Sequence, residues 1–305
     1  MKEIPKGLES LNDSGYYLWK YIPSVPLAII FAILFLAITG LHIKKLFDSR
    51  TWYCIWFIIG GLMEVAGFIA RCVANYNTGK LIPYVIQNLL LLLPPVLFAA
   101  TVYMVLGRII RHVNGEIYSL VPVKWMTFIF VMGDLLSFVV QGGGAGLMVI
   151  GDAEKTERGE KMIVGGLLIQ VVVFGFFCVT AVVFHLRYNR HSVAAAAYGG
   201  RGGMAEGWKK LLFMLYGVSG LIMARSLFRV AEFAMGEDGY LLANEWPLYV
   251  FDSVLMLAVM GAFWMWHPNL LVREGGRERV RSQVSLEETE LSSGTGLKDR
   301  GYLGP

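Results

Sequence analysis

The amino-acid sequence predicts an all-α integral membrane protein, a bundle of seven transmembrane helices with the N-terminus outside and the C-terminus in the cytoplasm. Of the 305 residues, 56% are hydrophobic and only 16% are charged, whereas soluble domains carry about 25% charged residues. The apolar residues gather in seven long stretches, and the basic residues gather in alternate connections between them. This pattern excludes a soluble globule, a disordered chain and a fibrous protein. Three cysteines are too few for a disulfide scaffold.

Each of the seven stretches is long enough to cross a hydrocarbon core of about 30 Å as a helix. Pro94-Pro95 predicts a kink in the third, and the run Gly142–Gly146 predicts a flexible exit from the fourth. The polar segment 152–161 that follows is expected to be a solvated surface turn. The predicted spans are 24–41, 52–70, 81–106, 123–141, 162–186, 211–230 and 248–266.

The distribution of lysine and arginine predicts the orientation. The first, third and fifth connections and the C-terminal tail together hold about twice as many basic residues as the opposite side, which identifies them as cytoplasmic. A glycosylation sequon begins at Asn12 on the predicted outer side. We therefore expect an extracellular N-terminus over 1–22, a seven-helix domain over 23–267 and a cytoplasmic, disordered tail over 268–305.

Polar and ionisable side chains interrupt the apolar spans. Such groups are costly in lipid and mark function by default. With the predicted orientation, all of them fall at the middle or in the outer half of the membrane. Residues seven apart lie on one helix face, as do residues spaced i, i+4 and i+7, so each helix presents a single polar stripe. The candidate residues are Glu64, Arg71, Gln87, Asp134, Gln141, Gln170, Arg225, Arg229, Glu232 and Asp252.

Two interpretations of these stripes remain open. In one, they surround a polar cavity above an apolar floor, where the acids pair with an amine head group and the arginines with a phosphate or carboxylate. In the other, they form a structural network that holds the helices together. The amount of buried charge favours a functional site.

In these stripes the sequence resembles the fungal lipid-translocating exporter family, also called the resistance-to-aminocholesterol family. Its members include sphingoid long-chain-base exporters and proteins linked to sterol-analogue resistance and porphyrin uptake. The resemblance implies seven helices with an outer N-terminus, a plasma-membrane or endomembrane location, and Tyr249 as a further substrate-binding residue. The motifs that carry it are Glu64-x-x-Gly67-x-x-x-Arg71; Gln87 with Pro95 and Ala99-Ala100-x-x-Tyr103; Phe130-x-x-x-Asp134-x-x-Ser137-x-x-x-Gln141-x-Gly143-Gly144; Gly165-Gly166-x-x-x-Gln170; and Arg225-x-x-x-Arg229-x-x-Glu232 followed by Glu245, Tyr249, Asp252 and His267-Pro268.

The favoured function is movement of an amphiphilic lipid, a sphingoid long-chain base or a sterol-like molecule, across the plasma membrane or an endomembrane. No phosphate-binding loop motif occurs, so the transport is expected to be facilitated or coupled to an ion gradient. Membrane lipids and the amphiphile are the expected partners. No metal or haem is expected, because histidines and cysteines lack ligand spacing, and no other cofactor or nucleic acid is expected. The alternatives are an intramembrane enzyme with Glu64 and Asp252 as its acid pair, and a seven-helix lipid sensor or receptor.

Overall fold

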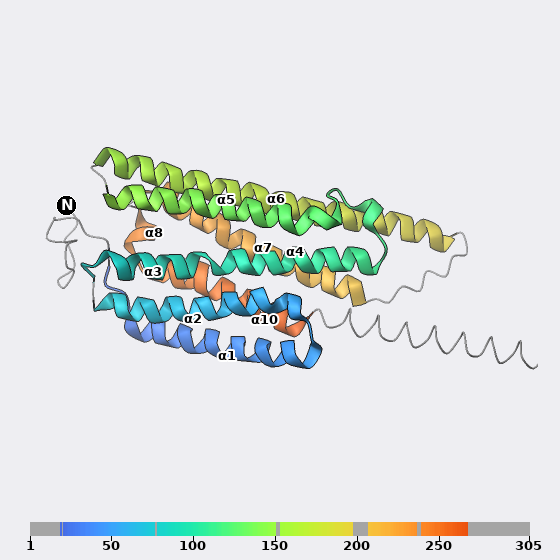
Figure 1. Cartoon of the computed structure of the whole chain (residues 1–305), viewed down its shortest axis with the longest axis horizontal. Helices are drawn as coiled ribbons and strands as arrows, with labels where there is room; N and C mark the ends of the chain where they lie inside the picture. Colours follow the sequence, from blue (N-terminus) through green and yellow to red (C-terminus); the bar gives the residue numbers. More distant parts are fainter. Residues whose placement is uncertain are drawn as a thin grey trace, which may run out of the picture.

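The computed structural model describes residues 19, 21–76, 78–150, 153–197, 207–236 and 239–267, and within these residues the chain is helical without any strand (Figure 1). Two short 3-10 turns, Trp52–Cys54 and Glu116–Tyr118, lie in connections. The helices are α1 (Val25–Ser49), α2 (Ile55–Asn75), α3 (Leu81–Leu92), α4 (Pro94–His112), α5 (Val123–Ile150), α6 (Ala153–Ala197), α7 (Gly207–Ala234), α8 (Tyr240–Ala243), α9 (Trp246–Leu248), the π-helix η4 (Tyr249–Val254) and α10 (Leu255–Met265).

Seven helical segments of the described chain are long and apolar enough to cross a membrane, which confirms the predicted number of spans and makes this a multi-pass membrane protein. α3 with α4 forms one span, and α9, η4 and α10 together form another. The side of the membrane on which each terminus lies stays a prediction. Asn12 and the tail 268–305 lie outside the described residues.

The helices are arranged so that α5 and α6 run side by side along one edge and α1 and α2 along the opposite edge (Figure 1). Between these pairs lie α4, α7 and α10. The packed interior centres on α4, where Phe98, Tyr103 and Leu106 are fully buried. On α1, in contrast, Ile30, Ile33 and Leu36 are exposed. Because these exposed residues are apolar, they form the surface that would contact lipid.

At Pro94-Pro95, where the sequence predicts a kink, the helix is interrupted at Leu93 between α3 and α4, and Leu93 itself keeps helical φ and ψ angles. Proline has no backbone N–H, so the carbonyls of Leu90 and Leu91 lose the donors that residues four positions later would supply in a continuous helix. Both carbonyls are therefore available to other partners in the interior of the bundle.

Two predictions about the connection between the fourth and fifth spans are wrong. The run Gly142–Gly146 is helical and belongs to α5, and the segment 153–161 is the start of α6. Close packing of the two helices explains why the glycines remain helical. A Cβ atom at Gly144 would lie 2.6 Å from the carbonyl oxygen of Gly159, so a side chain there would keep the helices apart.

Candidate functional site

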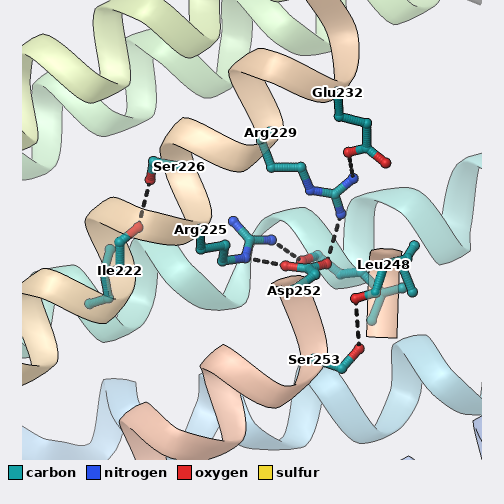
Figure 2. Close-up of polar contacts among 9 residues, drawn as sticks. Ile222, Arg225, Ser226, Arg229, Glu232, Leu248, Asp252 and Ser253 are labelled. Atoms are coloured by element: carbon teal, nitrogen blue, oxygen red, sulfur yellow. Dashed lines mark hydrogen bonds and ion pairs between the residues drawn. The ribbon is translucent and has the colours of Figure 1, made fainter. Parts of the chain in front are cut away.

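The largest group of buried charges joins α7 to the π-helix η4 (Figure 2). The Nε atom of Arg225 donates to Oδ1 of Asp252. Arg229 Nη2 donates to the other oxygen of Asp252 over 2.7 Å, and Arg229 Nη1 donates to Oε2 of Glu232 over 2.8 Å. All four side chains are less than 10% exposed. Asp252 thus bridges two guanidinium groups at the centre of the network.

Local helix geometry explains this arrangement. Arg225, Arg229 and Glu232 are spaced i, i+4 and i+7, so they share one face of α7. Asp252 lies in the wider turn of η4, and the hydroxyl of Ser253 donates to the carbonyl of Leu248, five residues earlier (Figure 2). A π-helical turn shifts the register of the residues that follow it and is frequent at functional sites.

Arg225 also ties the network to the break between α3 and α4. Its Nη2 atom donates to the carbonyl of Leu91 over 3.2 Å. This is the carbonyl whose helical donor would have been the missing N–H of Pro95. The proline pair therefore supplies an acceptor to a buried arginine, and the break in the third span has a structural role.

Glu64 on α2 lies within electrostatic range of Asp252, Arg225 and Arg229 and is 3% exposed. Among the described residues it forms neither an ion pair nor a hydrogen bond. Gln87 on α3 is also buried, and its Oε1 atom accepts no hydrogen bond from the described part of the chain.

A second group surrounds Arg71 near the end of α2. Arg71 Nη2 forms an ion pair with Glu245 over 2.7 Å and donates to the hydroxyl of Tyr21, and its Nε donates to Tyr249 over 3.3 Å. The guanidinium also lies over the rings of Trp19, Tyr21 and Tyr249 at 5.5–5.7 Å. Arg71 thereby connects α2, the segment before α1 and the start of the last span.

The third group lies between α4, α5 and α6. The hydroxyl of Tyr103 donates to Oδ2 of Asp134 over 2.8 Å, and Gln141 Nε2 donates to Gln170 over 3.2 Å. Oδ1 of Asp134 is buried and accepts no hydrogen bond from the described residues. The structure therefore brings nine of the candidates together in three groups; Glu64 lies beside the first group without a direct bond, and Gln87 joins none of them by a hydrogen bond within the described residues. The first two adjoin, since Tyr249 and Asp252 share η4, and Glu64 and Arg71 share one face of α2.

Sequence reasoning missed the partners that complete these groups. Glu245 and Tyr103 belong to the motifs of the resemblance but are not among the candidate residues. Tyr21 gave no signal, because an aromatic residue just before a span is typical of the membrane interface. Within the described residues, no cluster of three or more histidine, cysteine, aspartate or glutamate side chains could hold a metal ion.

Comparisons with known proteins place the chain among fungal membrane proteins. It is 32% identical to "Protoporphyrin uptake protein 1" of Saccharomyces cerevisiae over 83% of this chain and 93% of that protein. It is 39% identical to "Protein RTM1" of the same species, over 72% of this chain and 68% of the relative. The "Sphingoid long-chain base transporter RSB1" of that yeast is 25% identical over 86% of this chain and 76% of its own length.

No solved structure matches the chain. The family described as "RTA1 like protein" matches residues 57–275, which contain most of α2 and all the spans that follow. All three groups of buried polar residues draw on this region. The chain belongs to the RTA1-like protein family.

Proposed function

We propose that this protein moves an amphiphilic lipid, a sphingoid long-chain base or a sterol-like molecule, across its membrane. The observation that carries the proposal is the set of buried charges of both signs at Glu64, Arg225, Arg229, Glu232 and Asp252 inside a membrane-spanning bundle. Charged side chains inside the membrane are energetically costly, and for this reason they mark a functional site by default. The relative named a sphingoid long-chain base transporter supports the same class of function.

The bundle is divided in a way that suits an amphiphile. The charged groups lie from the middle to the end of α2, toward the end of α7 and at the start of the last span. Earlier on α2, the contacts are aromatic: the ring of Phe57 lies 4.5 Å from that of Phe98 and 4.4 Å from that of Phe263. A polar head group would interact with the first region and a hydrocarbon chain with the second.

The orientation and location also belong to this proposal. With the N-terminus outside, the buried charges lie at mid-depth or in the exoplasmic half of the membrane, and the plasma membrane is the favoured location, with an endomembrane as the alternative. The sequence lacks a phosphate-binding loop motif, so we propose facilitated or gradient-coupled movement.

A flux assay tests the proposal. The full chain is reconstituted into liposomes that carry a fluorescent sphingoid base, and an impermeant quencher reports the base that reaches the outer leaflet, with and without a pH gradient. Liposomes that contain an unrelated seven-helix protein control for lipid movement caused by helices alone. We expect faster movement with this protein than with the control, and equal rates would contradict the proposal.

The enzyme alternative is less well supported. An acid-catalysed mechanism at Glu64 and Asp252 requires a free carboxyl group at each position. Both oxygens of Asp252, however, already accept hydrogen bonds from guanidinium groups. Mass analysis of the lipid after the flux assay separates the two functions, because an enzyme changes the lipid chemically and a transporter leaves it intact.

A further inference from the structure

The acids near the centre of the bundle differ in how they are paired. Asp252 is held by Arg225 and Arg229, and Glu232 is held by Arg229. Glu64 is equally buried but has no ion pair or hydrogen bond within the described chain. The charged residues near Glu64 are Asp252, Arg225 and Arg229.

The charge balance of this region is uneven. Three carboxylates, those of Glu64, Glu232 and Asp252, face two guanidinium groups. Because Asp252 and Glu232 use the arginines in direct ion pairs, Glu64 is the carboxyl group of this region that is left without an ion pair. A buried, uncompensated carboxylate is strongly unfavourable, so Glu64 either holds a proton or is charged when a cation joins it.

The backbone near Glu64 offers one further oxygen acceptor. Gly60, Glu64 and Gly67 share one face of α2. A Cβ atom on Gly67 would lie 2.6 Å from a methyl group of Leu91, and one on Gly60 would lie 3.3 Å from the carbonyl oxygen of Pro94. The face that carries Glu64 therefore packs against the break between α3 and α4. There the Leu90 carbonyl lacks its helical donor, because Pro94 has no N–H.

We propose that Glu64 is the counter-ion of a primary ammonium head group, and that the ion-paired Arg225, Arg229, Glu232 and Asp252 form the frame that holds this site. A primary ammonium has three donors and no acceptor, which matches one carboxylate beside the Leu90 carbonyl. The inference rests on the proposed function and narrows it: the protein selects amphiphilic amines over neutral amphiphiles with the same chain, and Glu64 determines that selectivity.

The test compares binding and flux of sphinganine, a primary amine, with N-acetylsphinganine, its neutral analogue, for the full chain in liposomes. Glu64→Gln keeps the size of the side chain and removes its charge. We expect this variant to bind sphinganine about tenfold more weakly, equivalent to about 1.4 kcal/mol, while its binding of the neutral analogue stays unchanged. Glu64→Asp, which keeps the charge, is expected to retain the preference for the amine.

Glu116→Gln is the matched control, because Glu116 is an exposed acid in the connection after α4 and the substitution is the same. If the role of Glu64 is purely structural, Glu64→Gln will weaken the binding of both ligands equally, and this result would overturn the inference. If Glu64→Gln keeps the preference for the amine and loses only the pH dependence of flux, the carboxyl group carries a proton and the inference is also wrong. If the wild-type protein moves neither ligand, the proposed function itself fails.

Discussion

At the scale of single residues, Asp252 holds two buried arginines in place. It accepts hydrogen bonds from Arg225 and Arg229, and the second of these arginines also holds Glu232. Removal of one partner from a buried ion pair leaves the other charge without compensation, and this costs more than the intact pair contributes. A substitution of Asp252 should therefore lower the free energy of unfolding, and this can be measured without any substrate.

Asp252→Asn is expected to destabilise the protein by about 3–5 kcal/mol, because two buried guanidinium groups lose their shared carboxylate. Thermal unfolding of the purified protein in detergent measures the change. Glu157→Gln provides the comparison, since the Glu157–Lys161 pair is exposed, and its unfolding midpoint should stay at the wild-type value. Equal midpoints for the two variants would show that the network contributes nothing to the fold.

His267 at the end of the last span predicts a dependence of stability on pH. Burial lowers the pKa of its imidazole from an ordinary 6.5 to about 4, and the nearby Lys45 and His42 act in the same direction. The unfolded chain takes up a proton near pH 6.5, whereas the folded protein resists it until about pH 4. The free energy of unfolding should therefore fall as the pH is lowered through this window.

The variant His267→Gln removes this titration. Unfolding midpoints measured between pH 7 and pH 5 should fall less steeply for the variant than for the wild-type protein. Since other groups titrate in the same range, the difference between the two slopes is the informative quantity. Identical slopes would mean that His267 has the same affinity for protons in the folded and unfolded states.

At the scale of elements, the contact between α5 and α6 depends on glycines that let the two backbones approach. A Cβ atom on Gly166 would lie 2.9 Å from the carbonyl oxygen of Ser137 and 3.1 Å from the backbone nitrogen of Gln141. The neighbouring Gly165 has open space at the corresponding position. Two adjacent glycines of one helix therefore differ only in what they face.

Gly166→Ala is expected to cost about 1–3 kcal/mol, because the added methyl group must push the backbone of α5 away. Gly165→Ala adds the same methyl group without a clash and is expected to be neutral or to stabilise the helix by up to about 1 kcal/mol. Thermal unfolding of the two variants side by side makes the comparison. A loss of stability in Gly165→Ala as large as that in Gly166→Ala would contradict the close packing of α5 on α6.

At the scale of the whole molecule, the seven spans could be predicted because lipid requires every backbone polar group to be satisfied within the span. Long apolar runs therefore identify the helices directly. Spacing within one helix also predicted the shared face of Arg225, Arg229 and Glu232. Contacts between helices could not be predicted in this way: nothing local to Arg71 indicates Glu245, and nothing near Asp134 indicates Tyr103. The wider turn at η4 also leaves no mark on the hydrophobic pattern.

The orientation of the whole bundle in the membrane can be measured at two exposed positions. Seven spans place the two ends of the bundle on opposite sides of the membrane, and the bias in basic residues assigns the connection after α1 to the cytoplasm and the connection after α2 to the outside. Asp48 is exposed in the last turn of α1, beside the first of these connections, and Lys80 is exposed in the second. Asp48→Cys and Lys80→Cys leave the charge bias intact or strengthen it, so neither substitution should itself reverse the protein.

The native Cys54, Cys72 and Cys178 are first replaced by serine or alanine. Asp48→Cys and Lys80→Cys are then introduced one at a time. A membrane-impermeant maleimide should label Lys80→Cys in intact cells that display the protein at the plasma membrane, and Asp48→Cys only after permeabilisation. A glycan at Asn12, detected by its removal with an endoglycosidase, would independently place the N-terminus on the outer side. The reverse labelling pattern would place the buried charges toward the cytoplasmic leaflet, and the proposed substrate would then have to reach Glu64 from that side.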